Sequence, residues 1–470
     1  FVVLLTSFSE GEKMQIKTQR YNIAVDEISK GGPSGYESVY LTSEGDNATS
    51  ELYSLLEQFE GRLLPAEARV IRQRNGSGLV EAIKGDKSLG IASGFKPSGA
   101  YHFGHKLASS AVAFFQKNGA QIFIPVADIE CEMDTRLSKE AYGYWAADNL
   151  LDWGANGINL DAAHVYLQSE EFRVNTLAYY SARGLSFELA ADIYGMDKLV
   201  SDFPFLFAGI TQVGDIILPQ HSDFGNFHSF MVSGQDQDGH MKMTVALAEA
   251  ALNRGTSFLG VQTIPSAFYI PHIRGIQGSK ASSSKQEGTL YLGSGPMQES
   301  LDERIITNLR KFDSADPLQL ERCALDMVRY IDFFNKRSIV NFGEISQDQR
   351  YLIYLNALDH TYGNKKIEAQ SKLDLHLIDI CRSKGQNNVE LVRDSLKEAL
   401  VEHQKKRELV LEYAKAKASY QPQGGWGMDD EKPSQPDFWK VPERAVVDES
   451  KRNQTEWQDL VVAMADQLVP

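Results

Sequence analysis

Cysteine is scarce in this sequence. Only Cys131, Cys323 and Cys381 occur in 470 residues, and they lie far apart. Because no two of them form a C-x-x-C pair, the sequence excludes a zinc knuckle and a disulfide framework, and we expect three reduced thiols.

Long apolar runs are absent as well. The run at residues 1–5 is far shorter than the roughly 20 residues of a membrane-spanning helix, and it lacks the basic flank of a signal peptide. We therefore expect a cytoplasmic protein with no membrane partner.

Positive charge is in deficit, with 48 Lys and Arg against 63 Asp and Glu and a net charge of −15. This balance argues against DNA and indiscriminate nucleic-acid binding, although a local basic face can still hold RNA on an acidic protein. The 42% apolar and 24% charged residues that are present form an ordinary composition for a folded protein of two or three domains.

Residues 87–295 alternate between short apolar runs and helical patterns. Strands are expected at 88–95, 120–130, 163–169, 228–234 and 258–264, and helices over 102–117, over 138–153 and after 234. This alternation predicts an α/β fold, a doubly wound parallel sheet whose ligands bind at the carboxyl ends of the strands.

The flanking regions differ from this pattern. Residues 1–86 are polar and mixed, and we interpret them as an appended N-terminal domain. Residues 296–418 show helical periodicity throughout and predict an all-helical C-terminal domain. Residues 419–470 are rich in Pro, Gly and acidic residues and predict an extended or wrapping C-terminal extension.

The stretch "GFKPSGAYHFGH", residues 94–105, ends a predicted strand and starts a helix. Small residues there let the backbone approach a ligand, and a helix N-terminus with His102 and His105 offers donors to phosphate oxygens. The alternative is a plain turn with two surface histidines.

Two further stretches have unusual chemistry. Residues 278–288, "GSKASSSKQEG", are a Gly- and Ser-rich loop that carries Lys280 and Lys285 and suits a polyphosphate, or else a solvated linker. Asp236, Gln237 and Asp238 follow an apolar strand and suit ribose hydroxyls or a polar substrate, or else Asp236 simply caps a helix.

Together these stretches resemble the class I aminoacyl-tRNA synthetases. "HFGH" at 102–105 is similar to their HIGH signature, "GQDQ" lies at 234–237, and "KASSS" at 280–284 is similar to their KMSKS signature. Residues 93–107, "VADIE" at 126–130, "ITQVGDIILPQ" at 210–220 and "DQDGHMKM" at 236–243 look most like the archaeal tryptophanyl branch. Gly239, Ala281 and the absence of a "GGR" stretch depart from that pattern.

The resemblance implies a Rossmann-like, HUP-type catalytic domain over 87–295 and a helical anticodon-binding domain over 296–418. It implies ATP-dependent activation of L-tryptophan and transfer to tRNA(Trp), with Mg2+ bridging ATP phosphates without a dedicated protein metal site, and a homodimer. Under this resemblance the catalytic residues are His102, His105, Lys280 and Ser282. ATP would bind to Gly94, Phe95, Lys96, Gly104, Asp236, Ala281 and Ser283. The amino acid would bind to Glu130, Gln212, Asp215 and Gln237.

Specificity and RNA contact give two finer expectations. The positions that read the indole N–H in the archaeal branch match Ala92 and Pro125, which have no side-chain acceptor, so Asp215 is predicted to accept that N–H. The expected RNA-backbone contacts lie along one predicted helix, with a solvated helix face as the alternative: His403, Lys405, Lys406, Arg407, Lys415 and Lys417.

Other classes of protein remain open. A tyrosyl enzyme shares the framework and the Q-x-x-D pattern at Gln212 and Asp215. A small-metabolite nucleotidyltransferase shares H-x-G-H but is usually short, and an inactive RNA-binding relative would be expected to lose the histidines or Lys280. A Rossmann dehydrogenase is disfavoured because no G-x-G-x-x-G follows the first strand.

Overall fold

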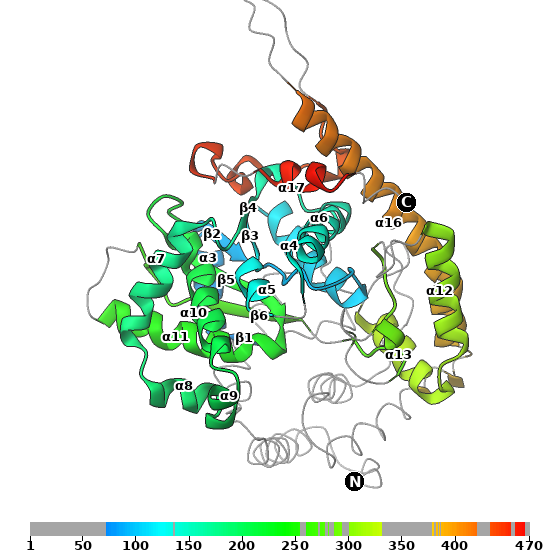
Figure 1. The fold of residues 1–470 in the computed structure, drawn as a ribbon, viewed down its shortest axis with the longest axis horizontal. Helices are drawn as coiled ribbons and strands as arrows, with labels where there is room; N and C mark the ends of the chain where they lie inside the picture. Colours follow the sequence, from blue (N-terminus) through cyan, green and yellow to red (C-terminus); the bar gives the residue numbers. More distant parts are fainter. Residues whose placement is uncertain are drawn as a thin grey trace, which may run out of the picture.

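The computed structural model describes residues 72–134, 137–253, 260–270, 273–277, 281, 286–293, 300–330, 378–379, 382–383, 385, 387–420, 433–452 and 456–465. The central feature is a six-stranded sheet in the order β1-β6-β5-β2-β3-β4. Only β1 is antiparallel to its neighbour, so the predicted α/β fold with a parallel sheet is confirmed (Figure 1).

The strands are β1 (Arg72–Arg74), β2 (Leu89–Ala92), β3 (Gln121–Val126), β4 (His164–Leu167), β5 (His228–Gly234) and β6 (Ser266–Ile270). Their side chains are buried almost continuously, because helices cover both faces of the sheet. In register, Ile91 of β2 lies between Ile122 of β3 and Phe230 of β5.

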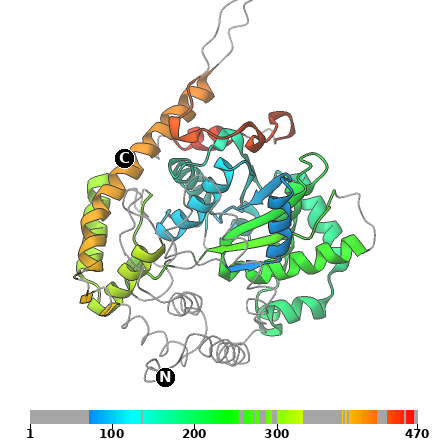
Figure 2. The ribbon, with the colours of Figure 1, turned by 180° about the vertical axis from the view of Figure 1, so that it is seen from behind.

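Alternate residues of each strand point into two different cores. Ile122 and Ile124 pack with α3 (Gly76–Lys84), α4 (Phe103–Lys117) and α6 (Lys139–Ala155). Phe123 packs instead with α7 (Phe172–Ser181), α10 (Pro204–Ile217) and α11 (Asp238–Asn253). Figures 1 and 2 show these helix layers on either side of the strands. The sheet is therefore doubly wound, and its ligand-binding edge lies where the parallel strands end.

The last strand is displaced from its predicted place. Within the expected range 258–264, residues 260–264 form a loop, and the strand begins at Ser266; residues 258–259 lie outside the described residues. The loop is held by Gln220, whose Oε1 accepts hydrogen bonds from the backbone N–H groups of Gln262 and Thr263 at 2.8 and 3.0 Å. The loop at residues 260–264 therefore precedes β6, and the predicted strand lies too early in the chain.

Strand β1 lies before the domain boundary expected at residue 86. Arg74 forms a double hydrogen bond with the fully buried carboxylate of Asp238, at 2.6 and 2.7 Å, and the Tyr269 hydroxyl donates to the same carboxylate at 2.7 Å. Arg74 lowers the pKa of Asp238 although burial opposes this. Residues 72–84 therefore belong to the sheet domain, because a buried charge requires its partner.

The C-terminal region is helical, as predicted, with α12 (Leu301–Asp313), α13 (Pro317–Tyr330) and α16 (Asn388–Ser419) among its described residues. Helix α16 extends from α12 and α13 to the sheet domain, where it packs on α6 (Figure 1). None of the described helices has both the length and the apolar composition that a membrane crossing needs.

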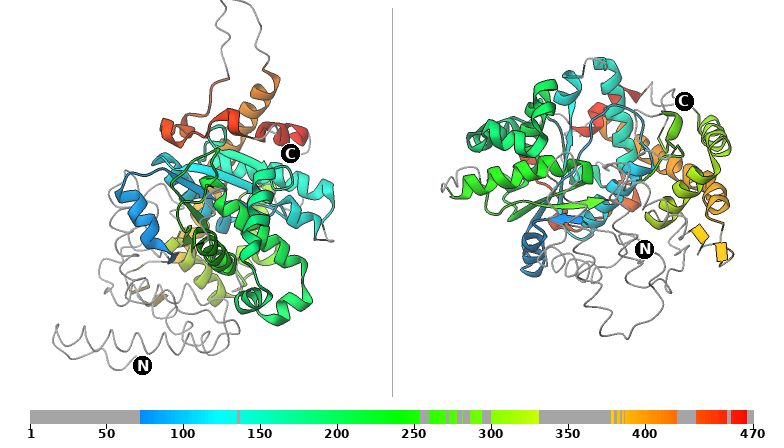
Figure 3. Two further views of the ribbon diagram at one scale, coloured as in Figure 1. Left: turned by 90° about the vertical axis from the view of Figure 1, so that its left-hand side faces the viewer. Right: turned by 90° about the horizontal axis from the view of Figure 1, so that it is seen from below.

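A C-terminal strap, residues 433–465, returns across the sheet domain (Figure 3). It contains three short 3-10 turns and α17 (Trp457–Ala463). The N–H of Val447 donates to the carbonyl of Ala162, and the indole N–H of Trp457 donates to Asp161 at 2.8 Å. The described part of the predicted extension therefore packs against the sheet domain.

Candidate active site

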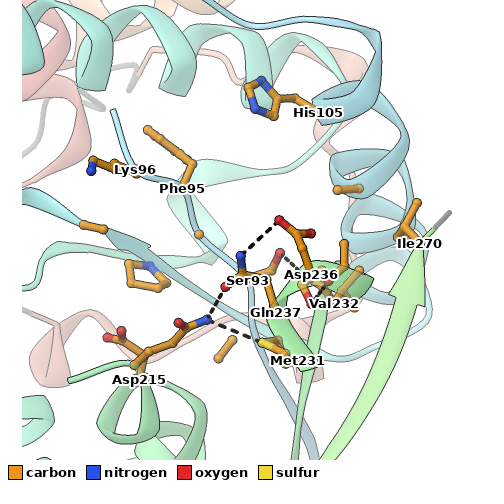
Figure 4. A pocket seen from close by; sticks show the side chains of 18 of the residues that line it. Ser93, Phe95, Lys96, His105, Asp215, Met231, Val232, Asp236, Gln237 and Ile270 are labelled. Atoms are coloured by element: carbon orange, nitrogen blue, oxygen red, sulfur yellow. Dashed lines mark hydrogen bonds between the residues drawn. The ribbon is translucent and has the colours of Figure 1, made fainter. Parts of the chain in front are cut away.

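A cavity of about 400 Å³ opens at the carboxyl ends of β2, β3 and β5. This is the size expected of a small-molecule site, and its place is the ligand-binding edge of a doubly wound sheet. Figure 4 shows the polar side chains that point into it.

Twelve of the fifteen residues expected from the sequence line this one cavity: Gly94, Phe95, Lys96, His102, Gly104, His105, Glu130, Gln212, Asp215, Asp236, Gln237 and Ala281. The other three, Lys280, Ser282 and Ser283, lie outside the described residues. The sequence separates these twelve by up to 187 positions, so the fold gathers them.

Gly94 is required by the neighbouring strand. A Cβ at this position would lie 2.0 Å from the carbonyl oxygen of Pro125. The backbones are this close because Phe95 N–H donates to Pro125 O at 3.1 Å and Ala127 N–H donates to Phe95 O at 3.0 Å. The sequence interpretation, in which Gly94 admits a ligand to the backbone, misses this contact with β3.

The two histidines form the start of helix α4. His102 is the N-cap, and its Nδ1 accepts from the N–H of Gly104 at 3.0 Å, while Nδ1 of His105 accepts from the N–H of His102 at 3.4 Å. The rings are stacked with centroids 3.8 Å apart. Gly104 is needed because a Cβ there would lie 2.9 Å from Cε1 of His102. Both imidazoles are thereby fixed at one edge of the cavity.

Lys96 and Glu130 face each other at the cavity wall. Nζ of Lys96 lies 3.3 Å from Glu130 and 3.1 Å from Asp134. Burial opposes the charge of Lys96, but these two carboxylates raise its pKa. Lys96 is therefore a cation held beside α5 (Asp128–Glu132), with a carboxylate next to it that is still accessible from the cavity.

Two polar side chains that follow β5 and one from α10 are joined in a row. The amide of Gln212 donates to Gln237 Oε1 at 3.3 Å, and the amide of Gln237 donates to Asp236 Oδ2 at 3.4 Å (Figure 4). Asp236 is exposed to the cavity, whereas Asp238, two residues later, is buried beneath Arg74. The two aspartates of "DQD" therefore face different surroundings.

Asp215 lies at the far wall of the cavity and is 1% exposed. Its carboxylate accepts from the Tyr166 hydroxyl at 2.9 Å and from the amide of Gln168 at 2.6 Å. Burial raises its pKa to about 7; the two donors work against this shift, while nearby Glu171 adds to it. The pKa of this buried carboxyl is therefore raised into the neutral range at the wall of the cavity.

Sequence reasoning missed several residues of the site. Trp153 lines the cavity beside Phe95, with ring centroids 5.4 Å apart, and Tyr166 and Gln168 orient Asp215. Trp153 sits in an apolar helix with no local signal. Gln168 lies near the end of the predicted strand at 163–169 and directly follows β4, and a polar residue close to a strand end is the kind of signal that pointed to Asp236.

The expected RNA face on α16 is partly wrong. His403 and Arg407 are 3% and 4% exposed because they bond to Asp152 and Asp148 of α6. Lys417 is bound to Asp161, and Lys406 pairs with Glu402 on its own helix. Of that set, only Lys405 and Lys415 are exposed.

Comparison with known proteins gives one consistent family. Residues 84–300 match the family described as "tRNA synthetases class I (W and Y)". The tryptophan–tRNA ligase of Methanocaldococcus jannaschii is 33% identical over 227 residues, which are 47% of this chain and 60% of that enzyme. That of Hyperthermus butylicus is 31% identical over 230 residues, 47% of this chain and 58% of that enzyme. The chain thus spans about three fifths of the length of these relatives.

Solved structures show the same fold. The tryptophanyl-tRNA synthetase of Aeropyrum pernix has a TM-score of 0.56 at 22% identity and covers 76% of this chain and 89% of its own. That of Encephalitozoon cuniculi bound to tryptophan has a TM-score of 0.52 at 13% identity, covering 77% and 91%. The sheet order, the cavity and the matched region agree: residues 84–300 of this chain are similar to the class I tRNA synthetases of the tryptophan and tyrosine group.

Proposed function

We propose that this protein is an aminoacyl-tRNA ligase that activates L-tryptophan with ATP and transfers the tryptophanyl group to tRNA(Trp). The observation that carries the proposal is the single cavity, which joins the histidine pair of α4, the polar row after β5 and the buried Asp215. The tryptophan–tRNA ligases among its relatives support the choice of amino acid.

The ATP phosphates would lie against the N-terminus of α4. The helix start carries partial positive charge, and both histidine rings are held there by the capping hydrogen bonds. ATP would enter as its magnesium complex, with the metal on phosphate oxygens. Lys280, Ser282 and Ser283 would close over the pyrophosphate, with Ala281 packed against the wall, and Asp236 would bind ribose.

The reaction follows from this placement. A carboxylate oxygen of tryptophan attacks the α-phosphorus of ATP, a new P–O bond forms, and the bond to the β-phosphate oxygen breaks with its electrons going to pyrophosphate. Cationic and N–H donors matter most where charge grows on the leaving group. The histidines and Lys280 would therefore act on the transition state, while Phe95 and Trp153 shield the site from water.

The amino acid would occupy the opposite end of the cavity. Glu130 and Gln237 would hold its ammonium group. Asp215 would accept the indole N–H, because Ala92 and Pro125, which also line the cavity, offer no side-chain acceptor. A buried indole N–H left unpaired costs about 1–3 kcal/mol. Asp215→Ala should therefore raise the KM for tryptophan at least tenfold, about 1.4 kcal/mol, and leave the KM for ATP nearly unchanged.

One observation favours a second candidate, a tyrosyl-tRNA synthetase. Gln212 and Asp215 lie one turn apart on α10 and both face the cavity, where a phenol hydroxyl would also find partners. ATP–pyrophosphate exchange with each of the twenty amino acids separates the two. Exchange that depends on tryptophan supports the first proposal, exchange that depends on tyrosine replaces it with the second, and exchange with neither overturns both.

A homodimer is proposed from one surface. Several large apolar side chains are exposed on or beside four helices that follow one another in the chain, α7, α8 (Phe187–Tyr194), α9 (Met196–Ser201) and α10. They are Phe172, Tyr179, Tyr180, Phe187, Met196, Val200, Phe203 and Phe207. Such a patch is typical of a protein interface. Phe207→Glu should convert the dimer to a monomer in light scattering, whereas Leu409→Glu, on α16, should not.

For tRNA, the exposed Lys405 and Lys415 remain the candidates on α16 within the proposed anticodon-binding domain. Reversing both charges should weaken tRNA charging and reduce its salt dependence, because fewer phosphate contacts release fewer counterions. Unchanged charging would place the tRNA elsewhere. We place this activity in the cytoplasm.

A further inference from the structure

Helix α16 contacts the residues on both sides of the histidine pair. Tyr101 precedes His102 and is fully buried, and its ring stacks on that of His403 with centroids 5.6 Å apart and planes 3° from parallel. Lys106 follows His105 and is also close to α16, where Lys406 and Glu402 act on its charge. Residues on both sides of the start of α4 therefore contact α16.

Tyr101 connects this contact to the histidines. Its ring lies 5.6 Å from the ring of His105, and its hydroxyl hydrogen-bonds to Oγ of Ser109, two turns into α4, at 2.5 Å. Its backbone continues directly into the N-cap, His102. A shift of the Tyr101 ring therefore moves the N-cap and the first turn of α4 together, because buried side chains transmit displacement.

His403 is itself held rigidly. Its Nε2 lies 2.9 Å from Oδ1 of Asp152, and the guanidinium of Arg407 bonds to the same oxygen at 2.8 Å and to Asp148. Burial lowers the pKa of His403 to about 4, so the imidazole is neutral and donates its Nε2 proton to the aspartate. The next residue along α6, Trp153, lines the cavity.

A second path from the helical domain reaches the same tyrosine. Arg304 of α12 bonds to the carbonyl of Leu292 at 2.6 Å and to Gln404, next to His403, at 3.2 Å. The N–H of Leu292 donates in turn to the carbonyl of Tyr101 at 3.0 Å. Two independent contacts from the helical region therefore meet at Tyr101.

We infer that His403 is a positioning residue for the histidine pair: by stacking on Tyr101 it fixes the start of α4, and it thereby couples the helical domain to the ATP end of the cavity. The inference rests on the proposed function for its kinetic consequence. His403 touches neither substrate; its effect passes through Tyr101.

The test compares His403→Gln and His403→Phe with a matched control. Gln keeps a donor for Asp152 and loses the ring, whereas Phe keeps a flat ring and loses the hydrogen bond. The control, Tyr413→Phe, removes a hydrogen bond of the same kind from α16, to buried Asp161, far from Tyr101.

In ATP–pyrophosphate exchange, His403→Gln should lower kcat at least tenfold with the KM for tryptophan within twofold. His403→Phe should recover kcat to within threefold of the parent protein, because the stack is kept. Tyr413→Phe should leave kcat unchanged. If His403→Gln matches Tyr413→Phe, or if His403→Phe is as impaired as His403→Gln, the positioning role is refuted.

Hydrogen exchange keeps the inference testable without activity. Amides of residues 103–106 should exchange at least tenfold faster in His403→Gln than in the parent protein, and should be unchanged in Tyr413→Phe. If the parent protein shows no ATP–pyrophosphate exchange in the presence of any amino acid, the proposed function fails. The hydrogen-exchange comparison still tests whether His403 fixes the start of α4. Equal protection in all three proteins would overturn it.

Discussion

The carboxyl of Asp215 makes stability depend on pH in a way that one substitution isolates. Asp215→Asn keeps the size of the side chain and one of the two oxygens that accept from Tyr166 and Gln168, replaces the other oxygen with an amide N–H donor, and removes the titration. In the folded protein burial raises the pKa of this group from 3.8 to about 7. In the unfolded chain the group is an ordinary aspartate.

The sign follows from linkage. Because the folded pKa is raised, the contribution of this group to stability is fully present below pH 3.8 and is lost as pH rises toward 7. Each pKa unit corresponds to about 1.4 kcal/mol, so the full shift corresponds to about 4 kcal/mol. The Asn variant lacks this loss. Its free energy of unfolding relative to the parent protein should therefore rise by about 3–4 kcal/mol between pH 4 and pH 8.

Urea unfolding of both proteins at pH 4, 5, 6, 7 and 8 measures this difference directly. Comparing the two proteins at each pH cancels every other titrating group. Parallel profiles for the two proteins would refute the reasoning, because they would show that the pKa of Asp215 is the same in the folded and the unfolded protein. Asp215 would then be a permanent anion in the cavity.

Three further predictions use contacts described above. Gly94→Ala should lower the melting temperature by at least 5 °C and abolish pyrophosphate exchange, because its Cβ would lie 2.0 Å from the Pro125 oxygen. The control Gly143→Ala should be neutral or stabilising, because the nearest contact of its Cβ is the flexible end of Met464 at 3.3 Å. Equal effects of the two substitutions would contradict this prediction. Arg74→Met should lower the free energy of unfolding, measured in urea, by about 3–5 kcal/mol, because Asp238 stays buried without its ion-pair partner. The control Arg444→Met breaks an exposed ion pair with Asp86 and should lower it by at most about 1 kcal/mol. Similar losses in the two variants would refute the buried ion pair of Arg74 and Asp238. His105→Ala should lower kcat in exchange at least a hundredfold with little change in the KM for tryptophan, and a normal kcat would reduce the motif to a helix cap.

The sequence predicted the features that depend on local pattern. Apolar runs located β2 to β5. The helix expected over 138–153 is α6, and Ser138 caps it by accepting from the N–H of Ala141 at 3.2 Å. The strand predicted at 258–264 was wrong, because residues 260–264 form a loop bonded to Gln220 that contains the same kinds of apolar residue as a strand. Apolar composition alone does not distinguish the two, since the deciding hydrogen bond is 42 residues away.

Charged residues were predicted least well, because their roles are set by distant partners. Arg407 looked like an RNA contact on a polar helix, yet it is buried between Asp148 and Asp152. Asp238 resembled Asp236 in its neighbourhood, but only the fold brings Arg74 to it. Nothing at positions 74 or 407 marks a buried ion pair, and residues of this kind are found only once the helices and strands are placed.

The C-terminal strap has a consequence for how the protein is made. Asp161 lies in the first half of the chain and is buried, and it bonds to four residues that are all synthesised long after it: Tyr413, Lys417, Gln435 and Trp457. During translation the carboxylate of Asp161 therefore lacks these four partners at a stage when the rest of the sheet domain has already been synthesised and can fold. The last bond to this group forms only when Trp457 has left the ribosome. A nascent chain that is released early, before residue 457, carries an incomplete core and becomes a natural substrate for chaperones and proteases.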